Sequence, residues 1–389
     1  MRSPLQTHTG RVLSSLPVLA ALCLLAACSK KGPDQPAKLA PIKSTLRVER
    51  IWSASVGDGG KMLRLGLRLA VQGDRVFASG HEGEVAAFDL ATGRRLWYTE
   101  THLPLGGGPA VHGNLLVVGA TDGHVIALDA ADGRVLWKVL LNGEVIARPA
   151  ISDTLVAVRS VDGKLRALSP SDGHELWEAS QDVPSLSLRG TSSPVIAGKL
   201  IVCGFDNGKV LAVNSQDGAQ VWLATVSEPR GRTEIQRLAD VDGPVAVAGK
   251  DVYAVGYHGT VAMLALQNGQ TWWSHKASSY RGLALGARAL YVSTSDGAVL
   301  ALNRANGAVI WRQGALRYRG LTAVADSADA VITADFQGYV HFLDKRTGEF
   351  VARVESGGVR VSNPPVVVGN EVLVINDAGR ITAYREGPL

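Results

Sequence analysis

The chain has 389 residues, with 40 basic and 35 acidic side chains, a formal net charge of +5 and 46% hydrophobic residues. The basic residues are scattered and no nucleic-acid-binding motif accompanies them, so the charge does not indicate a nucleic-acid-binding protein. Only three cysteines are present, Cys23, Cys28 and Cys203, which excludes a disulfide framework.

The N-terminal residues 1–27 have a basic start, an apolar stretch and no acidic residue. This pattern predicts a secretory signal whose apolar core is too short for a membrane-spanning helix. Its end, Leu25-Ala26-Ala27-Cys28, resembles the cleavage box of bacterial lipoproteins. The resemblance implies cleavage before Cys28, lipidation of Cys28 and, from the neighbouring Ser29, sorting to the outer membrane. An ordinary signal followed by a chance cysteine is the alternative.

Residues 28–45 are rich in proline and lysine, so we expect the lipidated Cys28 to be followed by a flexible tether. The remainder, residues 46–389, is predicted to be one domain, because a single repeat runs through it.

A glycine-to-tryptophan segment recurs along the chain, and its best copy runs from Gly123 to Trp137. A seventh copy starts at Gly338 but has Ala352 where tryptophan is expected, and an eighth starts at Gly379 and reaches the chain end first. The starting glycines are 38 to 51 residues apart. The other full copies are Gly83–Trp97, Gly163–Trp177, Gly208–Trp222, Gly259–Trp273 and Gly297–Trp311.

A period near 40 residues with short apolar runs predicts an all-β fold, an eight-bladed β-propeller of four-stranded antiparallel blades. The runs are apolar at successive positions, as expected for strands buried on both faces. Residues 46–52 resemble the missing end of the eighth copy, so we expect the N-terminal strand to close the ring. The regular tryptophans are predicted to join neighbouring blades: Trp52, Trp97, Trp137, Trp177, Trp222, Trp273 and Trp311.

Two consecutive repeats carry extra residues between their tryptophan and the next glycine, at 181–190 and 224–243. Equivalent connections lie on one face of a propeller, and such insertions often form the binding face. The first insertion offers Leu186, Leu188 and Arg189, a combination typical of an interface anchor. The alternative is that the leucines pack under their own loop and the charges are only solvated. A third extension, residues 57–68, has no assigned role.

Signals of chemistry are sparse. The nine histidines show no metal-binding spacing, and neither a nucleophile elbow nor a P-loop is present. The aspartates that precede glycines follow the repeat, so they are predicted to be turn residues. We therefore expect no catalytic residue, no metal and no cofactor, and a buried, inert thiol at Cys203.

The repeats resemble the tryptophan-docking repeats of pyrroloquinoline-quinone (PQQ) enzymes, the alcohol and glucose dehydrogenases. A PQQ-dependent oxidoreductase is therefore one alternative. Most of the methanol-dehydrogenase-like members of that family carry two adjacent cysteines near the quinone and insertions that cover it. This chain has neither adjacent cysteines nor long insertions of that kind.

Residues 184–190 (PSLSLRG) and 233–243 (TEIQRLADVDG) resemble the BamB family, the propeller lipoproteins of the outer-membrane β-barrel assembly machinery. The resemblance implies a non-enzymatic scaffold, lipid-anchored at the periplasmic face of the outer membrane. It further implies docking on the POTRA domains of BamA and assistance to unfolded outer-membrane clients. The implied binding residues are Leu186, Leu188, Arg189, Asp240 and Asp242, the aspartates orienting the arginine or pairing with partner cations. A propeller scaffold of another envelope complex is the second alternative.

Overall fold

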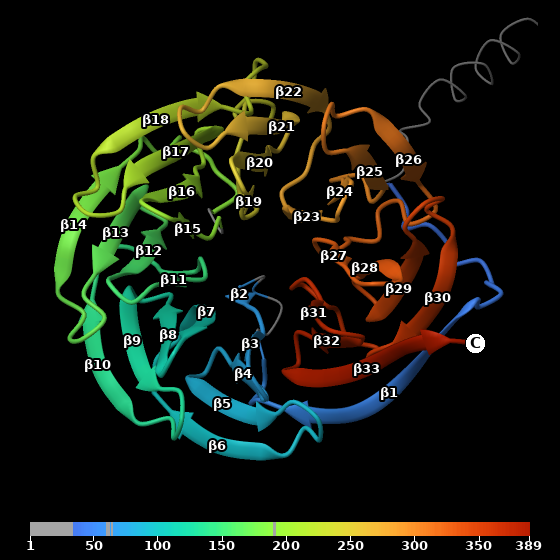
Figure 1. The fold of residues 1–389 in the computed structure, drawn as a ribbon, viewed down its shortest axis with the longest axis horizontal. Coiled ribbons are helices and arrows are strands. Elements are labelled where there is room, and N and C mark those ends of the chain that lie inside the picture. Colours follow the sequence, from blue (N-terminus) through green and yellow to red (C-terminus); the bar gives the residue numbers. More distant parts are fainter. Residues whose placement is uncertain (1–33, 60–62, 64, 190–191) are drawn as a thin grey trace, which may run out of the picture. The chain divides into compact units, whose positions relative to one another are not determined.

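Antiparallel β-sheets form the blades of a ring around a central axis (Figure 1). The structure is a computed structural model that describes residues 34–59, 63, 65–189 and 192–389. It contains eight sheets, which confirms the eight-bladed β-propeller predicted from the repeats. Within the described residues, no helix has the length and apolar character needed to cross a membrane.

Blades 1 to 4 follow one another along the chain, each running from its inner to its outer strand. Blade 1 contains β3 (Ala70–Gln72), β4 (Arg75–Ser79), β5 (Glu84–Asp89) and β6 (Arg95–Glu100). Blade 2 contains β7 (Leu105–His112), β8 (Leu115–Ala120), β9 (His124–Asp129) and β10 (Val135–Leu140). Blade 3 contains β11 (Ala150–Ile151), β12 (Val156–Ser160), β13 (Lys164–Leu168) and β14 (Glu175–Ser180). Blade 4 contains β15 (Val195–Ala197), β16 (Leu200–Gly204), β17 (Lys209–Asn214) and β18 (Gln220–Thr225).

Blades 5 to 8 complete the ring. Blade 5 contains β19 (Ala246–Ala248), β20 (Asp251–Val255), β21 (Thr260–Ala265) and β22 (Thr271–Lys276). Blade 6 contains β23 (Leu283–Leu285), β24 (Ala289–Ser293), β25 (Val299–Asn303) and β26 (Val309–Gln313). Blade 7 contains β27 (Ala325–Asp326), β28 (Ala330–Ala334), β29 (Tyr339–Asp344) and β30 (Phe350–Glu355). Blade 8 contains β31 (Val366–Val368), β32 (Glu371–Ile375), β33 (Arg380–Pro388) and, as its outer strand, β1 (Leu46–Ser55).

The ring is closed by its two ends, because β1 pairs with β33 from Leu46–Pro388 to Ser55–Arg380. This pairing confirms the predicted role of the N-terminal strand. It also removes two free strand edges that an open array of blades would leave exposed.

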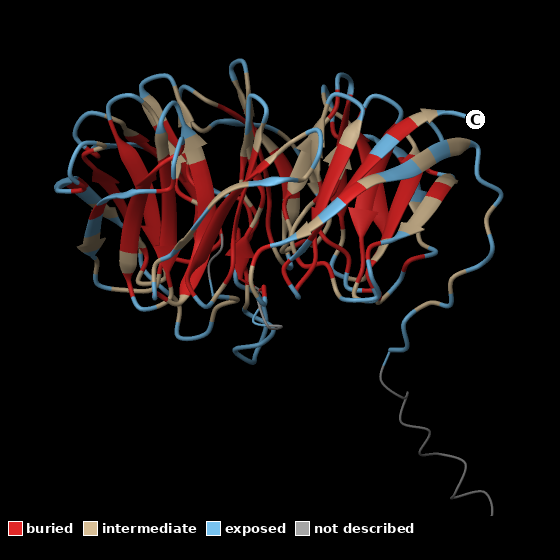
Figure 2. Ribbon diagram, turned by 90° about the horizontal axis from the view of Figure 1, so that it is seen from below, coloured by how far each residue is buried: buried red, intermediate tan, exposed pale blue. Residues whose placement is uncertain are grey.

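The core lies between the blades. The second and third strands of each blade are buried along almost their whole length, whereas outer strands such as β10 alternate between exposed and buried residues. Figure 2 shows this as buried strands inside the ring and exposed connections along both of its edges. A strand covered by a blade on each side must be apolar on both faces, which is why its sequence does not alternate.

Tryptophans on the outer strands join each blade to the next. Trp137 is 7% exposed, and its indole nitrogen donates to the carbonyl of Pro170 in the following blade at 2.8 Å. Its ring lies against Gly173, where an added Cβ would come within 2.6 Å of it. The other six indoles donate in the same way, Trp52 to Leu90, Trp97 to Ala130, Trp177 to Ser215, Trp222 to Leu266, Trp273 to Arg304 and Trp311 to Lys345.

The last part of the extension at residues 57–68, which the sequence left without a role, lies at the centre of the ring (Figure 1). Its residues Gly66–Leu67 form β2, a short inner strand that pairs in parallel with β7 and makes blade 2 five-stranded. Glycine is required at position 66 because an added Cβ would lie 2.3 Å from the carbonyl oxygen of Ile146. The backbone amide of Arg68 then donates to the carbonyl of Gly108 at 2.9 Å, which fixes Arg68 beside the central axis.

Residues 37–45, which we call the strap, lie in extended form against blade 7. Leu39 packs on the apolar cluster around Trp311. Four hydrogen bonds of 2.8–2.9 Å hold the strap: Ala37 N to Arg317 O, Arg319 Nη1 to Ala37 O, Arg353 Nη1 to Ala40 O and Thr45 N to Val351 O. The prediction of a flexible tether as far as residue 45 is therefore wrong for the strap. The predicted signal, residues 1–27, and Cys28 lie outside the described residues.

Candidate functional site

The connections from each outer strand to the next inner strand share one face of the ring, which we call the loop face. Most of them are short, such as residues 101–104 between β6 and β7. Two long connections come from neighbouring blades: loop 1, residues 181–194 after β14, and loop 2, residues 226–245 after β18. The connection from β1 to β3, residues 56–69, is as long as loop 1 but contains β2. The extra length of the two consecutive repeats therefore lies in one sector of the loop face.

Loops 1 and 2 are hydrogen-bonded to each other. The backbone amide of Leu188 donates to Asp240 Oδ1 at 2.8 Å, and Ser185 Oγ donates to Glu234 Oε2 at 3.2 Å. Asp240 is fully buried, so it is a positioning residue that fixes the backbone of loop 1 beside Leu188. The described residues of the two loops therefore form a single surface.

The carboxyl group of Asp240 lies in an environment that disfavours its charged form. Its Oδ2 atom is buried without a hydrogen-bond partner. Burial, reinforced by the nearby charge of Asp206, raises the pKa of Asp240 to about 6, although the Leu188 amide acts in the opposite direction. Asp206 is itself paired with the buried Arg159 at 2.8 Å, so the charge of that arginine is matched by Asp206 rather than by Asp240. Strained carboxylates of this kind are typical of functional sites.

Arg189 follows Leu188 and is exposed at the surface of the loop face. It has a left-handed backbone, with φ of 75°, and its Nε donates to Glu144 Oε2 at 3.1 Å. The expectation that Asp240 or Asp242 orients this arginine is wrong, because Glu144, in the connection between β10 and β11, is its carboxylate partner. The pair is half-exposed and therefore weak, worth at most about 1 kcal/mol.

Asp242 is 5% exposed and lines a cavity at the centre of the loop face rather than the outer surface of loop 2. Asp240 and Asp242 are thus both buried, and their predicted pairing with cations of a docked protein stays a prediction. Their burial was invisible in the sequence, because the residues that cover them come from other blades.

Three apolar side chains are exposed among the mostly polar surface residues of the two loops. Leu186 and Val183 of loop 1 are both 42% exposed, and Ile235 of loop 2 is 68% exposed, whereas Leu188 is partly buried. Ile235 occupies a single turn in which Arg237 N donates to Thr233 O at 3.1 Å. Sequence reasoning missed Val183 and Ile235; an isolated isoleucine in an otherwise polar loop was the available signal. Exposed apolar side chains on an ordered loop are suited to protein binding.

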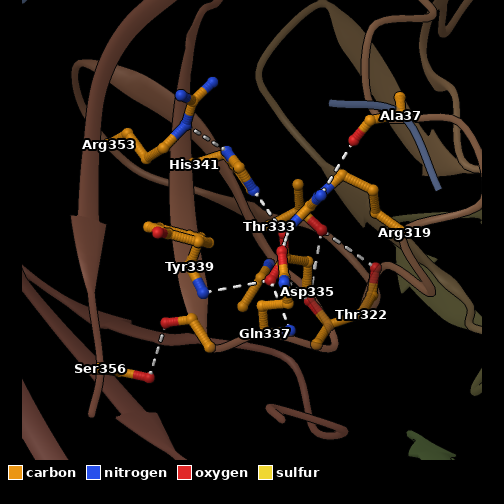
Figure 3. A network of polar contacts seen from close by, with 12 residues as sticks. Ala37, Arg319, Thr322, Thr333, Asp335, Gln337, Tyr339, His341, Arg353 and Ser356 are labelled. Atoms are coloured by element: carbon orange, nitrogen blue, oxygen red, sulfur yellow. Dashed lines mark hydrogen bonds and ion pairs between the residues drawn. The ribbon is translucent and has the colours of Figure 1, made fainter. Parts of the chain in front are cut away.

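The most extensive buried charge network lies elsewhere, in blade 7 (Figure 3). Arg319 Nε donates to Asp335 Oδ2 at 2.7 Å, and Arg353 Nε donates to His341 Nδ1 at 3.1 Å. His341 must then carry its proton on Nε2, which lies 3.1 Å from Asp335 Oδ2. Burial lowers the pKa of His341 against the raising effect of Asp335, so the ring is neutral.

This network binds the strap rather than a substrate. Asp335 and His341 are completely buried, and the outer members Arg319 and Arg353 donate to backbone carbonyls of the strap. Burial alone would raise the pKa of Asp335, but the hydrogen bonds and charges of His341 and Arg319 outweigh it and lower that pKa. Asp335 is therefore stabilised in its charged form, which supports a structural role for this network.

Among the described residues, no group of three or more His, Cys, Asp or Glu side chains is arranged to hold a metal ion. Cys203 is a buried free thiol, and burial raises its pKa to about 12. A thiol with this pKa is protonated and unreactive at neutral pH.

A family model described as outer membrane protein assembly factor BamB matches residues 48–103 and 81–313. An assembly factor BamB of Pseudomonas aeruginosa is 40% identical over 371 residues, covering 94% of this chain and 97% of the relative. The corresponding protein of Marinobacter adhaerens is 45% identical over 373 residues, covering 95% of each.

Solved structures give a consistent comparison. The crystal structure of BamB from Moraxella catarrhalis superimposes with a TM-score of 0.81 at 27% identity, covering 87% of this chain and all of that one. Quinohemoprotein alcohol dehydrogenase from Comamonas testosteroni reaches a TM-score of 0.68 at 13% identity, covering 87% of this chain and 76% of that one. The latter likeness shows the propeller fold alone.

Proposed function

Because the chain belongs to the family of outer membrane protein assembly factor BamB, we propose that it is a non-enzymatic scaffold of β-barrel assembly. Its loop face docks on POTRA domains of BamA, and the resulting complex assists the folding and insertion of outer-membrane clients. The name that its relatives carry supports the assembly role. The geometry of loops 1 and 2 supports the site of docking.

One observation carries the proposal: two loops from neighbouring blades are tied together and present apolar side chains to solvent. Leu186 and Ile235 are the exposed anchors, and the bond from Leu188 N to Asp240 keeps loop 1 in position. Docking on a surface that is already ordered loses less conformational entropy than docking on free loops. The free energy gained by burying the leucines of loop 1 is therefore offset less by the cost of ordering the loop, and more of it contributes to affinity.

Arg189 contributes specificity in this scheme. Its partner Glu144 is exposed enough for the ion pair to be exchanged at small cost, so an acidic side chain of the docking domain replaces or extends it. The left-handed backbone at Arg189 directs the loop into this arrangement. The role of Asp240 is indirect, through the position of Leu188.

We further propose that a lipid on Cys28 anchors the protein to the periplasmic face of the outer membrane. The cleavage box before Cys28 supports this. The strap adds a geometric argument, because Ala37 is hydrogen-bonded to Arg317 in the connection between β26 and β27, on the loop face. A chain from Cys28 to Ala37 spans at most about 30 Å. The tether therefore joins the propeller at Ala37, a residue bonded to a connection of the loop face.

The test is binding of the full chain, purified in uncharged detergent, to an immobilised BamA POTRA region. The variant carries Leu186→Ala, Leu188→Ala and Arg189→Ala. Its control carries Leu136→Ala, Lys138→Ala and Leu140→Ala, which are exposed residues of the same kinds on β10. Each lost hot-spot contact is worth about 1–2 kcal/mol, so the loop variant should bind at least about tenfold more weakly.

The control should bind like the natural protein, and both variants should keep its melting temperature to within about 3 °C, since all the altered side chains except the partly buried Leu188 are exposed. Failure of the natural protein to bind would refute BamA docking and direct the search to another envelope complex. A loop variant that loses binding and thermal stability together would show that loop 1 is structural.

A further inference from the structure

The centre of the loop face contains a cavity of about 290 Å³. Its walls come from connections spread around the ring and from the segment that precedes blade 1. The polar side chains among the lining residues include Arg68, Asp242, Tyr257, Tyr280, Arg281 and Asn363. Leu188 of loop 1 lies at its rim. The cavity is therefore distinct from the exposed apolar surface of loops 1 and 2 but adjoins it.

Arginines dominate the charge of this cavity. Arg68 and Arg281 line it, and Arg148, from the connection between β10 and β11, is close enough to act on the charge of Arg68. Burial, followed by the charges of Arg148 and Arg281, lowers the pKa of Arg68 to about 10, which Asp242 only partly opposes. Asp242 is the one acidic side chain among the described lining residues. The described lining residues of the cavity therefore carry more positive than negative charge.

The guanidinium groups of Arg68 and Arg148 retain capacity for hydrogen bonds. Within the described part of the chain, the Arg68 side chain makes no hydrogen bond or ion pair, and the Nε of Arg148 is buried without a partner. Arg281 is held in place over the ring of Tyr280, 4.8 Å from its centroid. Tyr280 in turn packs edge-on against Tyr257, with ring centroids 5.9 Å apart.

Repulsion between neighbouring guanidinium groups does not stabilise a fold, and nothing in blade 2 requires an arginine at position 68. The two backbone hydrogen bonds of residue 68 accept any residue other than proline, and β2 is secured by Gly66 and the buried Leu65 and Leu67. Planar guanidinium forks are the preferred donors to carboxylate and phosphate oxygens. Such a ligand would supply the negative charge that the cavity lacks.

We propose that this cavity is an oxyanion-binding site in which Arg68 and Arg281, which line it, donate to a carboxylate or phosphate group, with the charge of Arg148 nearby. The tyrosine hydroxyls of the wall provide further donors. The group belongs either to a small free anion or to an acidic side chain of a peptide segment that enters the mouth. The site does not depend on BamA docking, since none of the three arginines lies in loop 1 or loop 2.

The experiment is isothermal titration of the full chain, in uncharged detergent at low ionic strength, with two probes. The first is inorganic phosphate and the second is a tri-glutamate peptide with blocked ends. We expect saturable binding with a dissociation constant at or below about 1 mM, weakened by added salt. Tighter binding of phosphate identifies a free anion as the ligand, and tighter binding of the peptide identifies an acidic segment.

Three variants distinguish the site from general attraction to a basic protein. Arg68→Gln should weaken binding about tenfold, the loss of one charge-assisted hydrogen bond, and Asp242→Asn should strengthen it. Arg346→Gln, which removes an 89% exposed arginine from a turn on the opposite face, should leave binding unchanged. Without ligand, the melting temperature of the Arg68→Gln variant should equal or exceed that of the natural protein, because repulsion is relieved.

Absence of binding by both probes overturns the proposal, as does equal binding by the Arg68→Gln and Arg346→Gln variants. A lower melting temperature of the Arg68→Gln variant without ligand also overturns it, since Arg68 would then be a structural residue.

Discussion

Replacing Asp240 by asparagine tests the inference that loop 1 is held by a destabilised carboxylate. The folded-state pKa is about 6, against 3.8 for an ordinary aspartate. Between these values the folded protein binds a proton that the unfolded chain does not. The stability contributed by protonated Asp240 is complete below pH 3.8 and is lost as the pH rises through 6. Two pKa units correspond to about 3 kcal/mol of unfolding free energy.

The asparagine of the Asp240→Asn variant keeps the oxygen that accepts from Leu188 N but has no charge to bury. Its amide nitrogen replaces Oδ2, which has no partner, so a pH-independent cost of about 1–3 kcal/mol accompanies the substitution. The informative quantity is therefore the difference in unfolding free energy between variant and natural protein as a function of pH. We expect it to move in favour of the Asp240→Asn variant by about 3 kcal/mol between pH 4 and pH 7.5.

The measurement is urea unfolding of both proteins at several pH values, followed by tryptophan fluorescence. Both proteins contain the other titrating groups, such as Glu386, whose pKa burial raises to about 7. The effects of these groups therefore cancel in the difference between the two proteins. The same difference at every pH would refute the raised pKa of Asp240. A difference that moves in favour of the natural protein as the pH rises would mean that the carboxylate is stabilised in its charged form by a contact with loop 1.

Two further predictions concern the tryptophan contacts and the strap. Trp137→Ala should lower the unfolding free energy by about 3–5 kcal/mol, because a buried indole and its hydrogen bond to Pro170 are lost. Trp272→Ala, at a 56% exposed position, should lower it by less than about 1 kcal/mol in the same urea titration. Similar losses would contradict the joining role of Trp137. Leu39→Asp should release the strap and accelerate hydrogen exchange of the Ala37 amide at least about tenfold. Lys38→Asp, which changes an exposed side chain, should leave this exchange rate unchanged. Equal exchange rates in the two variants would mean that Leu39 does not hold the strap.

The fold was predictable because its information is local and repeated. Each copy of the segment around Gly123 and Trp137 contains the buried third strand of a blade, the turn between the third and fourth strands and the residue that joins the next blade. The same local rules therefore specify the ring several times over. The position of loops 1 and 2 followed from a departure in spacing, which is also local.

The details of the site depend on contacts between non-repeating segments, for which the sequence has no periodic signal. Glu144 lies 45 positions before Arg189 and 96 before Asp240, so only the ring geometry reveals which carboxylate meets the arginine and which is buried. The strap was misjudged for a related reason. Its proline and lysine content is typical of a flexible segment, but Arg319 and Arg353 supply donors to its backbone that composition cannot anticipate.

The missing tryptophan at Ala352 follows from the way the ring closes. Each indole needs a carbonyl in the turn between the third and fourth strands of the next blade. In blade 8 these strands are β33 and β1, from opposite ends of the chain, so that turn does not exist. The direction of the contact is reversed here, since the hydroxyl of Tyr384 in blade 8 donates to Glu355 O in blade 7 at 3.0 Å.

The strap reinforces this same junction. Leu46 and Val48, which continue from the strap into β1, pack on the cluster that contains Ala352 and Tyr384, and the strap itself is hydrogen-bonded to the outer strand β30. The segment that leads toward the predicted lipid anchor is thus part of the contact that replaces the eighth tryptophan.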